Sequence, residues 1–518
     1  MNQAEGFKTF CLQGVTGSGK TEVYLQAMSP LLAAGKQVLV LVPEIALTPQ
    51  TVQRFEERFN VPVICLHSEL TDKKRLEAWS QAYCGHARII IGTRSAVFVP
   101  LKNPGMIVID EAHDPSFKQQ SGFRYSARDV AIRRAQMENL PIILGSATPS
   151  LETLMNVRRG RFEFLSLPER AGEAKPPKMT MVDLRDKKLN AGLSDYLIET
   201  IREHLKQNTQ VLLFLNRRGY APTLMCHHCG WMAVCARCDA RMTLHKNPTR
   251  LFCHHCGSQA RAPQICNSCE QADLSDIGVG TEQLEQALAN LFPDEKIVRI
   301  DRDSTRKKGS LQEKLDQIHS GEAKLLIGTQ MLSKGHHFAN LSLVAIVDAD
   351  GGLYGTDFRS MERMAQLIVQ VSGRAGREER VGEVLIQTHH PDNALLQLLL
   401  KKGYSVFADA VLKEREVAAL PPFTHFALLR AEAIGKELPL NFLRAVKQNV
   451  SHTNVQLLGP IPAPMERRAG RYRAQLLIQS SDRAALHVMS DLLIEACQNL
   501  PLSRKVRWSL DIDPQEML

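Results

Sequence analysis

The chain has 518 residues, of which 44% are hydrophobic and 23% charged, and 64 Lys and Arg against 55 Asp and Glu give a net charge of +9. This length predicts about three or four globular domains, because one hydrophobic core rarely serves so long a chain. The apolar runs are too short to cross a bilayer, and the N-terminus lacks the basic and apolar regions of an export signal. We therefore expect a cytoplasmic protein with no membrane association, whose modest basic excess is compatible with a polyanionic partner but identifies none.

The first part of the chain alternates short apolar segments with longer stretches of helical pattern. The apolar segments are residues 10–13, 38–42, 63–66, 88–91, 106–109 and 142–144. Strands rich in Val, Ile and Leu with helices between them are typical of a parallel sheet covered on both faces. The sequence therefore begins with an α/β lobe.

A phosphate-binding loop lies between the first predicted strand and the helix that follows it. Residues 14–21 read GVTGSGKT, the pattern G-x-x-x-x-G-K-[ST] in its strand–loop–helix context. The backbone N–H groups and the helix N-terminus favour phosphate, Lys20 is expected to reach the β- and γ-phosphates of ATP, and the Thr21 hydroxyl is expected to ligate Mg²⁺. The candidate nucleotide-binding residues are Gly14, Val15, Thr16, Gly17, Ser18, Gly19, Lys20 and Thr21.

An acidic pair follows the predicted strand 106–109, at the carboxyl end where parallel sheets bind ligands. Asp110 is expected to hold Mg²⁺ through water, and Glu111 to orient and deprotonate the attacking water. His113 is expected to sense the γ-phosphate across the cleft. Residues 146–148 (SAT) bring short hydroxyl side chains to the next strand end, although Ser and Thr are also ordinary turn residues.

A second series of apolar segments predicts a second lobe between about residues 196 and 390. Its strands are expected at residues 211–215, 297–300, 324–327, 343–347 and 384–386, and residues 168–177 (PERAGEAKPP) have the composition of a linker. Residues 89–96 (IIIGTRSA) and 325–332 (LLIGTQML) resemble each other. This echo indicates either two copies of one nucleotide-binding lobe or the ordinary preference of strand ends for Gly-Thr.

Two arginines in the second lobe are candidates for a role in catalysis. Residues 370–377 (QVSGRAGR) place Arg374 and Arg377 on a glycine-punctuated helix start. A guanidinium that reaches across the interlobe cleft stabilises charge on the transferring phosphoryl group, an effect worth about 10³–10⁵ in rate. The alternative is a solvated basic turn.

Eight of the twelve cysteines form four C-x-x-C pairs within 44 residues. They are Cys226, Cys229, Cys235, Cys238, Cys253, Cys256, Cys266 and Cys269. Paired cysteines without an export signal favour metal over disulfides, and this spacing predicts two closed four-thiolate Zn²⁺ sites that are structural. The spacing leaves open which pairs share an ion, and the neighbouring histidines (residues 227, 228, 254 and 255) are either alternative ligands, solvated or in contact with DNA phosphates.

The order of the motifs resembles that of the superfamily 2 helicases. In chain order they are GVTGSGKT, VPEIALTPQ, GTRSA, DEAH, SAT, GTQMLSKGHHF and QVSGRAGR. Residues 117–125 (FKQQSGFRY) and the cysteine-rich insert make the chain similar, over essentially its whole length, to the family of primosomal protein N′, the PriA-type replication-restart helicases.

The resemblance implies an activity, its cofactors and its partners. The activity is ATP-dependent 3′→5′ unwinding of DNA at stalled or abandoned replication forks, with initiation of primosome assembly to reload the replicative helicase. The cofactors are ATP, Mg²⁺ and two Zn²⁺. The partners are forked and single-stranded DNA, single-stranded-DNA-binding protein and other primosome proteins, for a cytoplasmic, nucleoid-associated protein.

The resemblance also implies that an aromatic-rich loop after the DEAH motif couples DNA binding to hydrolysis. Phe117, Phe123 and Tyr125 offer faces on which bases stack, worth about 1–3 kcal/mol per base, and Lys118 and Arg124 suit phosphates. The alternative is that these aromatic side chains belong to the core.

Finer features of the insert and the C-terminal region complete these expectations. The resemblance favours nested zinc ligands, with cysteines 226/229 joined by 266/269 and cysteines 235/238 joined by 253/256. Trp231 is either a strand-separating or stacking residue or a packed one. The four arginines and one tyrosine of residues 467–473 are either a contact to DNA or single-stranded-DNA-binding protein or a solvated hairpin turn.

The expected fold class is α/β, with two tandem RecA-like parallel-sheet lobes, a zinc-binding insert in lobe two and a small C-terminal α+β domain. The expected boundaries are 1–165 for the ATP-binding lobe, 166–216 for the linker and the start of lobe two, 217–278 for the insert, 279–408 for the rest of lobe two and 409–518 for the C-terminal domain. The sequence departs from the family at Ala112, where a second Glu is usual. Since only thirteen residues precede Gly14, we expect the family's fork-recognition and adenine-reading segments to be absent here.

Two other functions remain open on the residues alone. One is a translocase that remodels protein–DNA complexes without separating strands. The other is a zinc-dependent scaffold that recruits primosome proteins.

Overall fold

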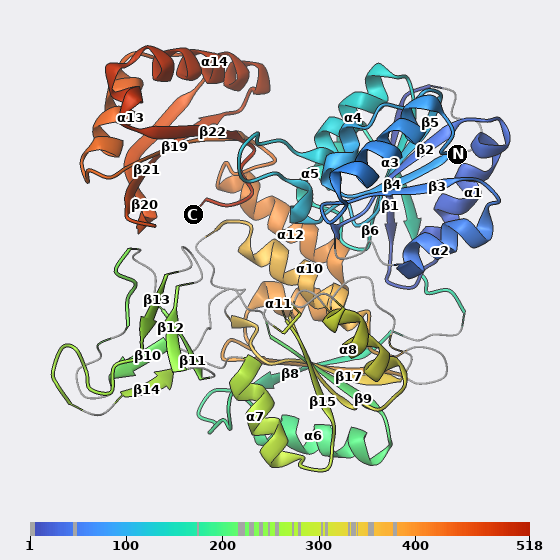
Figure 1. The fold of residues 1–518 in the computed structure, drawn as a ribbon, viewed down its shortest axis with the longest axis vertical. Coiled ribbons are helices and arrows are strands. Elements are labelled where there is room, and N and C mark those ends of the chain that lie inside the picture. Colours follow the sequence, from blue (N-terminus) through green and yellow to red (C-terminus); the bar gives the residue numbers. More distant parts are fainter. Residues whose placement is uncertain are drawn as a thin grey trace. The chain divides into compact units, whose positions relative to one another are not determined.

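The computed structural model consists of two compact units (Figure 1). The first comprises residues 1–216, 285–354 and 360–410, and the second comprises residues 217–284, 355–359 and 411–518. The residues that the structure describes are 6–44, 49–172, 176–215, 223–226, 231, 233–237, 242–246, 249–253, 258–271, 274–277, 281–301, 304–305, 309–329, 332, 338, 340–350, 357–376 and 381–517.

The first unit begins with a seven-stranded parallel sheet of order β3-β4-β2-β5-β6-β1-β7. The strands are β1 (Lys8–Gly14), β2 (Gln37–Leu41), β3 (Val63–Leu66), β4 (Ile89–Gly92), β5 (Pro104–Ile109), β6 (Pro141–Ser146) and β7 (Glu163–Leu167). The helices are α1 (Lys20–Ala33), α2 (Pro49–Arg58), α3 (Asp72–Cys84), α4 (Ala127–Met137) and α5 (Leu151–Arg158), with 3₁₀ turns η2 (Arg94–Phe98) and η3 (Pro115–Phe117).

Helices cover both faces of this sheet because successive strand residues alternate between two cores. Val38 and Val40 pack with α1 on one face, whereas Leu39 and Leu41 pack with α3 and α4 on the other. Strands that are apolar at every position must be buried on both sides. The α/β lobe expected from the apolar segments is confirmed.

The second lobe, also in the first unit, has a six-stranded parallel sheet of order β15-β16-β9-β17-β18-β8. Its strands are β8 (Lys178–Asp183), β9 (Gln210–Phe214), β15 (Ile297–Ile300), β16 (Leu325–Gly328), β17 (Leu341–Ile346) and β18 (Glu383–Thr388). The helices are α6 (Asp195–Lys206), α7 (Thr281–Leu291), α8 (Ser310–His319), α10 (Ser360–Ser372) and α11 (Ala394–Lys402), followed by α12 (Tyr404–Val417).

The two lobes have the same topology. Taken in chain order, the six strands of lobe two are arranged 3-4-2-5-6-1, which is the order of β1 to β6 in lobe one. A buried glutamine starts the second strand of each lobe: Gln37 Nε2 donates to the carbonyls of Ala82 and Ala87 at 2.9 and 2.7 Å, and Gln210 Nε2 donates to two carbonyls, both at 2.8 Å. The Gly-Thr echo falls on β4 and β16, which hold the same place in their sheets, and this favours two copies of one lobe.

The second unit contains two antiparallel sheets. The cysteine-rich sheet has the order β13-β12-β11-β10-β14, with β10 (Thr223–Cys226), β11 (Thr243–Lys246), β12 (Thr249–Phe252), β13 (Gln259–Arg261) and β14 (Leu274–Ile277). The C-terminal sheet has the order β20-β21-β19-β22, with β19 (His425–Ala433), β20 (Gln456–Arg468), β21 (Arg471–Ser480) and β22 (Arg507–Ile512). Its core is covered by α13 (Leu438–Gln448) and α14 (Arg483–Asn499), and η4 (Pro501–Arg504) precedes β22.

The strands β7, β8 and β20 were not predicted from the sequence, and the expected position of the insert is corrected as a result. Lobe two was expected to begin with the strand at 211–215, which puts the insert at 217–278 after its first strand. β8 precedes β9, so the insert follows the second strand instead. β8 (KMTMVD) lies at the sheet edge and is only partly buried, so it lacks the continuous apolar run that identified the others. β7 pairs with β1 and ends at Leu167, so the first lobe runs just past residue 165.

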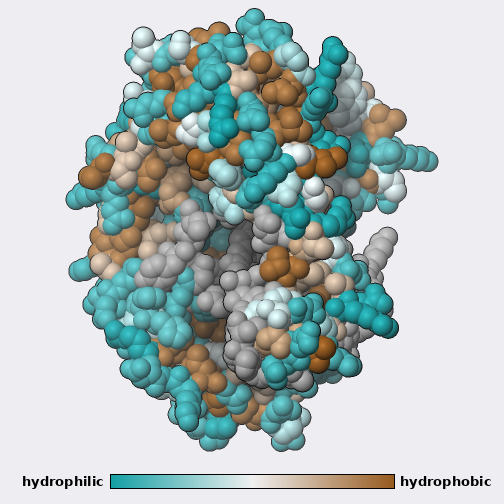
Figure 2. Space-filling model, turned by 90° about the vertical axis from the view of Figure 1, so that its left-hand side faces the viewer, coloured by the Kyte–Doolittle hydropathy of each residue, from teal (hydrophilic) through white to brown (hydrophobic). Residues whose placement is uncertain are grey.

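The surface has the mixed character of an ordinary globular protein. Figure 2 shows hydrophobic residues interspersed with hydrophilic ones on the face that it displays. Among the residues that the structure describes, none of the helices is both long and apolar enough to cross a membrane.

Candidate functional site

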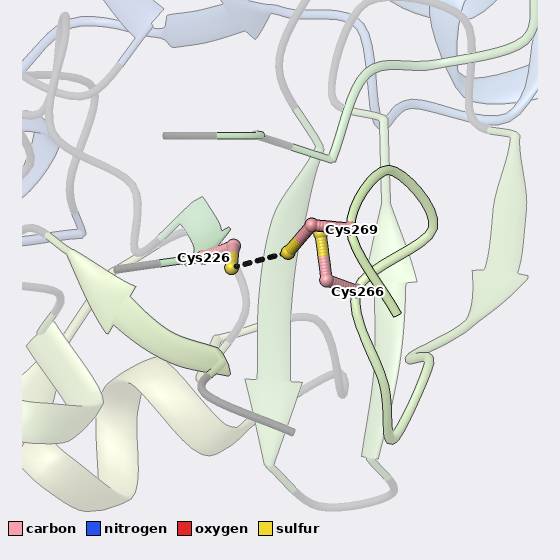
Figure 3. Close-up of side chains that lie close together, drawn as sticks. All are labelled: Cys226, Cys266 and Cys269. Carbon is pink, nitrogen blue, oxygen red and sulfur yellow. Dashed lines mark hydrogen bonds between the residues drawn. The ribbon is translucent and has the colours of Figure 1, made fainter. Parts of the chain in front are cut away.

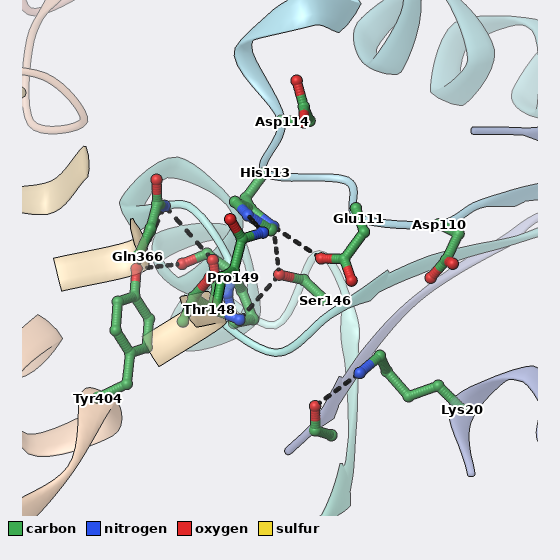
Figure 4. A network of polar contacts seen from close by, with 12 residues as sticks. Lys20, Asp110, Glu111, His113, Asp114, Ser146, Thr148, Pro149, Gln366 and Tyr404 are labelled. Carbon is green, nitrogen blue, oxygen red and sulfur yellow. Dashed lines mark hydrogen bonds and ion pairs between the residues drawn. The ribbon is translucent and has the colours of Figure 1, made fainter. Parts of the chain in front are cut away.

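The phosphate loop joins β1 to α1 and has the backbone conformation that its glycines permit. Gly17 and Gly19 have φ of 83° and 84°, in the left-handed region that a side chain disfavours. The Lys20 ammonium donates to the Gly14 carbonyl at 2.8 Å (Figure 4). The Val15 N–H donates to the Leu167 carbonyl at 3.2 Å. The loop is thus fixed between β1 and β7, with its lysine folded over it.

The acidic pair lies where β5 ends, as its position after a buried strand predicts. Tyr24 on α1 donates its hydroxyl hydrogen to Asp110 Oδ1 over 2.9 Å. Burial and then the charge of Glu111 raise the pKa of Asp110, whereas Lys20 and the Tyr24 hydrogen bond oppose the rise. Lys20 and the Tyr24 hydroxyl therefore favour the charged form of Asp110, against burial and the neighbouring Glu111.

Glu111 is held in a strained backbone conformation beside the acidic strand end. Its φ is 48°, a region sparsely populated by residues with a side chain, and strain of this kind clusters at functional sites. Glu111 Oε2 is buried without a hydrogen bond, and the nearest partner is His113 Nδ1 at 3.5 Å, longer than a normal hydrogen bond. The carboxylate therefore keeps an acceptor for a water or substrate proton.

His113 joins the acidic motif to two other motifs, of which Figure 4 shows the contact with Ser146. Its Nδ1 lies 2.7 Å from Ser146 Oγ, and its Nε2 lies 2.7 Å from Gln370 Nε2 on α10 of lobe two. An amide nitrogen only donates, so His113 Nε2 accepts and its proton sits on Nδ1, which donates to Ser146. Ser146 Oγ in turn accepts from the Thr148 N–H at 2.9 Å.

Further contacts between the lobes surround this network. Leu151 N–H donates to Glu362 at 3.0 Å, and the Tyr404 hydroxyl donates to the Pro149 carbonyl at 2.8 Å. Next to the phosphate loop, a Cβ on Gly373 would lie 2.4 Å from Thr16 Oγ1, so only glycine permits this approach.

The linker also bridges the phosphate loop and lobe two. The Ala171 N–H donates to the Gly17 carbonyl at 2.9 Å, and the Arg170 guanidinium donates to the Gly376 carbonyl at 2.9 Å. Two neighbouring linker residues therefore connect the phosphate loop, through hydrogen bonds, to the loop that follows α10.

Arg374 was expected at a helix start, and this is wrong. α10 ends at Ser372, and Arg374 lies in the turn that follows, where its N–H donates to the Val371 carbonyl at 3.0 Å. The sequence SGRAG reads equally well as a C-terminal glycine stop. Arg377 lies outside the described residues.

The aromatic-rich loop begins inside the core and ends at the surface. Phe117 is 2% exposed within the sheet core, so the expectation that it offers a stacking face is corrected, and Lys118 is also buried. Phe123 is 77% exposed and stacks on Tyr125 with ring centroids 5.7 Å apart. Arg94, from the GTRSA motif, donates to the Lys118 carbonyl at 3.3 Å and so ties the loop to that motif.

Three of the eight paired cysteines converge in the insert (Figure 3). The Sγ atoms of Cys226, Cys266 and Cys269 all lie within 4.8 Å of one another, and Cys226 Sγ is 3.6 Å from Cys269 Sγ. Three thiols so close together, from the first and last of the four pairs, are a donor set suited to Zn²⁺. This is the outer set of the nested arrangement, whose fourth member, Cys229, lies outside the described residues.

The remaining cysteines are placed in part. Cys235 and Cys253 are buried in the same small core of the insert, while Cys238 and Cys256 lie outside the described residues, as do the four neighbouring histidines. Trp231 is partly buried against this core, which favours packing over an exposed stacking role.

The C-terminal arginine cluster forms the turn of the β20–β21 hairpin, and this turn contacts the insert. The Gly470 N–H donates to the Arg237 carbonyl at 2.7 Å, and Met465 packs against the insert core. The cluster is a hairpin turn, as one of its two interpretations proposed, but it is not free of protein contacts.

Sequence reasoning missed three side chains of this site. Tyr24, Gln370 and Arg170 lie in segments that were noted only for their neighbours. Gln370 carried a signal, since it is the first residue of the QVSGRAGR motif. The only signal for Tyr24 was its position four residues after Lys20, which places the two side chains on the same face of a helix.

These features define a class of protein, the helicases with two parallel-sheet lobes. The phosphate loop and the acidic motif both lie at the strand ends of the first lobe. Family models agree. The DEAD/DEAH box helicase model matches residues 1–157, and the helicase conserved C-terminal domain matches residues 249–379. The PriA DNA helicase Cys-rich region domain matches residues 235–261, and the primosomal protein N C-terminal domain matches residues 416–515.

Relatives identify the family more narrowly. The chain is 50% identical over 515 residues to the replication restart protein PriA of Haemophilus influenzae, covering 99% of this chain and 70% of that protein. It is 38% identical to the Bacillus subtilis protein of the same name and 40% identical to that of Synechocystis, covering 99% and 98% of this chain but only 64% and 63% of those relatives. The chain belongs to the replication restart protein PriA family, which confirms the resemblance.

Proposed function

We propose that this chain uses ATP hydrolysis to move 3′→5′ along DNA and unwind it at stalled or abandoned forks, where it initiates assembly of the primosome. The observation that carries this proposal is His113, which contacts Ser146 in lobe one and Gln370 in lobe two at 2.7 Å each. His113 lies beside the acidic motif and is hydrogen-bonded in both lobes. In this proposal it couples the presence or absence of the γ-phosphate to movement of one lobe relative to the other.

The residues at the strand ends fit Mg-ATP. Lys20 and the backbone N–H groups of the loop suit the phosphates, and Thr21 and Asp110 have the oxygen donors that Mg²⁺ prefers. When bound, the ion supplies charge neutralisation on the phosphates. Glu111 deprotonates the attacking water, and Arg374, with Arg377, stabilises the charge that develops on the transferring phosphoryl group.

Two Zn²⁺ ions complete the insert in this proposal. The ligands of one are Cys226, Cys229, Cys266 and Cys269, and those of the other are Cys235, Cys238, Cys253 and Cys256. Support comes from the three Sγ atoms within 4.8 Å and from the shared burial of Cys235 and Cys253. Closed four-thiolate sites leave no position for substrate, so the ions stabilise the fold of the insert.

The proposed partners are DNA, single-stranded-DNA-binding protein and other primosome proteins. Residues 467–473 supply arginines near the insert, and guanidinium groups suit both phosphate and carboxylate. Removal of phosphate contacts should lower the salt dependence of DNA binding. An unchanged salt slope after substitution of the exposed Arg468 would argue against the DNA contact.

The decisive experiment compares ATP hydrolysis by this chain without DNA, with single-stranded DNA and with forked DNA, alongside strand displacement. We expect stimulation by both DNAs and displacement from the fork. Stimulation without displacement would favour a translocase. Primosome assembly that persists in Lys20→Ala, with hydrolysis abolished, would favour the scaffold role, and hydrolysis that survives Lys20→Ala would contradict the nucleotide site.

The exposed end of the aromatic loop gives a specific prediction. Phe123→Ala should raise the DNA concentration that half-maximally stimulates ATP hydrolysis by about 5- to 150-fold, since one lost base stack is worth about 1–3 kcal/mol. Hydrolysis without DNA should stay unchanged. Phe164→Ala, an exposed aromatic on β7, is the matched control, and an equal loss in both variants would contradict the stacking role.

A further inference from the structure

Tyr24 connects the helix of the phosphate loop to the acidic strand end. Its side chain is 2% exposed, and its hydroxyl lies 2.9 Å from Asp110 Oδ1. The two residues are 86 positions apart in sequence, one on α1 and one after β5. The hydrogen bond therefore links two segments that must both face the same nucleotide.

The backbone of β6 is shaped to admit this hydroxyl. A Cβ on Gly145 would lie 1.5 Å from Tyr24 Oη and 2.7 Å from its Cζ, so any side chain there would displace the tyrosine ring. The Gly145 carbonyl accepts from the Ala112 N–H at 2.9 Å, and Ser146, the partner of His113, is the next residue. The hydroxyl thus lies where the phosphate-loop helix, the acidic motif and the Ser146 strand meet.

Tyr24 is the donor in this hydrogen bond, because a carboxylate oxygen only accepts. A phenol has one hydrogen to donate, and Asp110 Oδ1 receives it. Oδ2 takes no part in this bond.

We propose that Tyr24 is a positioning residue for Asp110: Tyr24 holds one carboxylate oxygen, so that the other faces the Mg²⁺ of bound nucleotide, through water, in a fixed orientation. The terminal torsion of an aspartate is otherwise broad, so an unheld carboxylate samples many orientations. Groups that orient a metal ligand in this way are worth about 10- to 100-fold in metal affinity. This inference rests on the proposed Mg-ATP chemistry.

The test is Tyr24→Phe, which removes the hydroxyl and keeps the ring. Binding of a fluorescent ATP analogue is titrated with Mg²⁺ at fixed nucleotide, and again without Mg²⁺. We expect the Mg²⁺ concentration for half-maximal binding to rise about 10-fold or more. Affinity for the nucleotide without Mg²⁺ and the thermal unfolding midpoint should stay close to those of the parent chain.

Two further variants separate positioning from packing. Tyr83→Phe removes the hydroxyl of an exposed tyrosine on α3, which makes no bond to Asp110, and should leave the Mg²⁺ midpoint unchanged. Gly145→Ala displaces Tyr24 without altering it and should raise the midpoint. An unchanged midpoint in Tyr24→Phe, or an equal loss of binding with and without Mg²⁺, would overturn the inference, whereas a parent chain that binds no nucleotide would overturn the proposed function instead.

Discussion

Glu111→Gln is expected to lower the rate of DNA-stimulated ATP hydrolysis by about 10²–10⁴-fold, the usual contribution of a general base. The substitution keeps the shape of the side chain and removes its ability to accept a proton at Oε2, which is buried without a hydrogen bond. Nucleotide affinity should change little, because phosphate contacts come from the loop at residues 14–21. Phosphate release under saturating ATP and DNA measures the rate.

A carboxylate elsewhere in the lobe serves as the control for this variant. Glu163 on β7 pairs with Lys8 at the surface, and exposed pairs contribute only about 0–1 kcal/mol to stability. Glu163→Gln should hydrolyse ATP at the parent rate. If Glu111→Gln also kept that rate, the attacking water would have to be deprotonated by another group.

Cys226→Ser is expected to remove one of the two proposed Zn²⁺ ions and to unfold the insert locally. Closed thiolate sites supply about 10–16 kcal/mol of folding free energy, more than so small a core provides. Cys226 is the last residue of β10, is buried, and its Sγ lies 3.6 Å from Cys269 Sγ, so the substitution removes a thiolate from the centre of the cysteine cluster. Metal content by a zinc-release assay and protease sensitivity within residues 217–278 are the measurements.

Cys84→Ser gives the comparison for this loss. Cys84 is exposed at the end of α3 and belongs to none of the C-x-x-C pairs. It should retain both ions and the parent proteolysis pattern. A Cys226→Ser protein with full zinc and an intact insert would rule out this cysteine as a ligand.

The fold was predictable from sequence wherever strands are buried on both faces. β2 and β9 were placed within one residue of their observed bounds, because every residue of each strand is buried and the runs VLVLV and VLLFL are continuously apolar. β7 and β20 were missed, since each is largely exposed or partly buried and its pattern depends on neighbours distant in sequence. The α/β class therefore followed from the apolar runs, whereas the largely exposed strands did not.

The chemical site divides in a similar way. Lys20, Asp110 and Glu111 were predictable because their roles require fixed residue types at fixed spacing. Phe117 was assigned a face for DNA because sequence does not distinguish an aromatic residue of a surface loop from one whose loop starts inside the core. The proposed role of Tyr24 could not be predicted, because it depends on Gly145 and Asp110, which only the fold brings next to it.

The matching strand order of the lobes also shows where the second lobe departs from the first. β8 occupies the position of the phosphate-loop strand β1, yet the sequence after it reads LRDKKLNAGLSD, which lacks the G-x-x-x-x-G-K-[ST] pattern. There Arg185 instead forms ion pairs with Asp183 and Asp392, both at 2.7 Å. The phosphate-binding pattern thus belongs to the loop after the first strand and not to the sheet: only lobe one carries it, and the lobe that lacks it carries the cysteine-rich insert between β9 and α7.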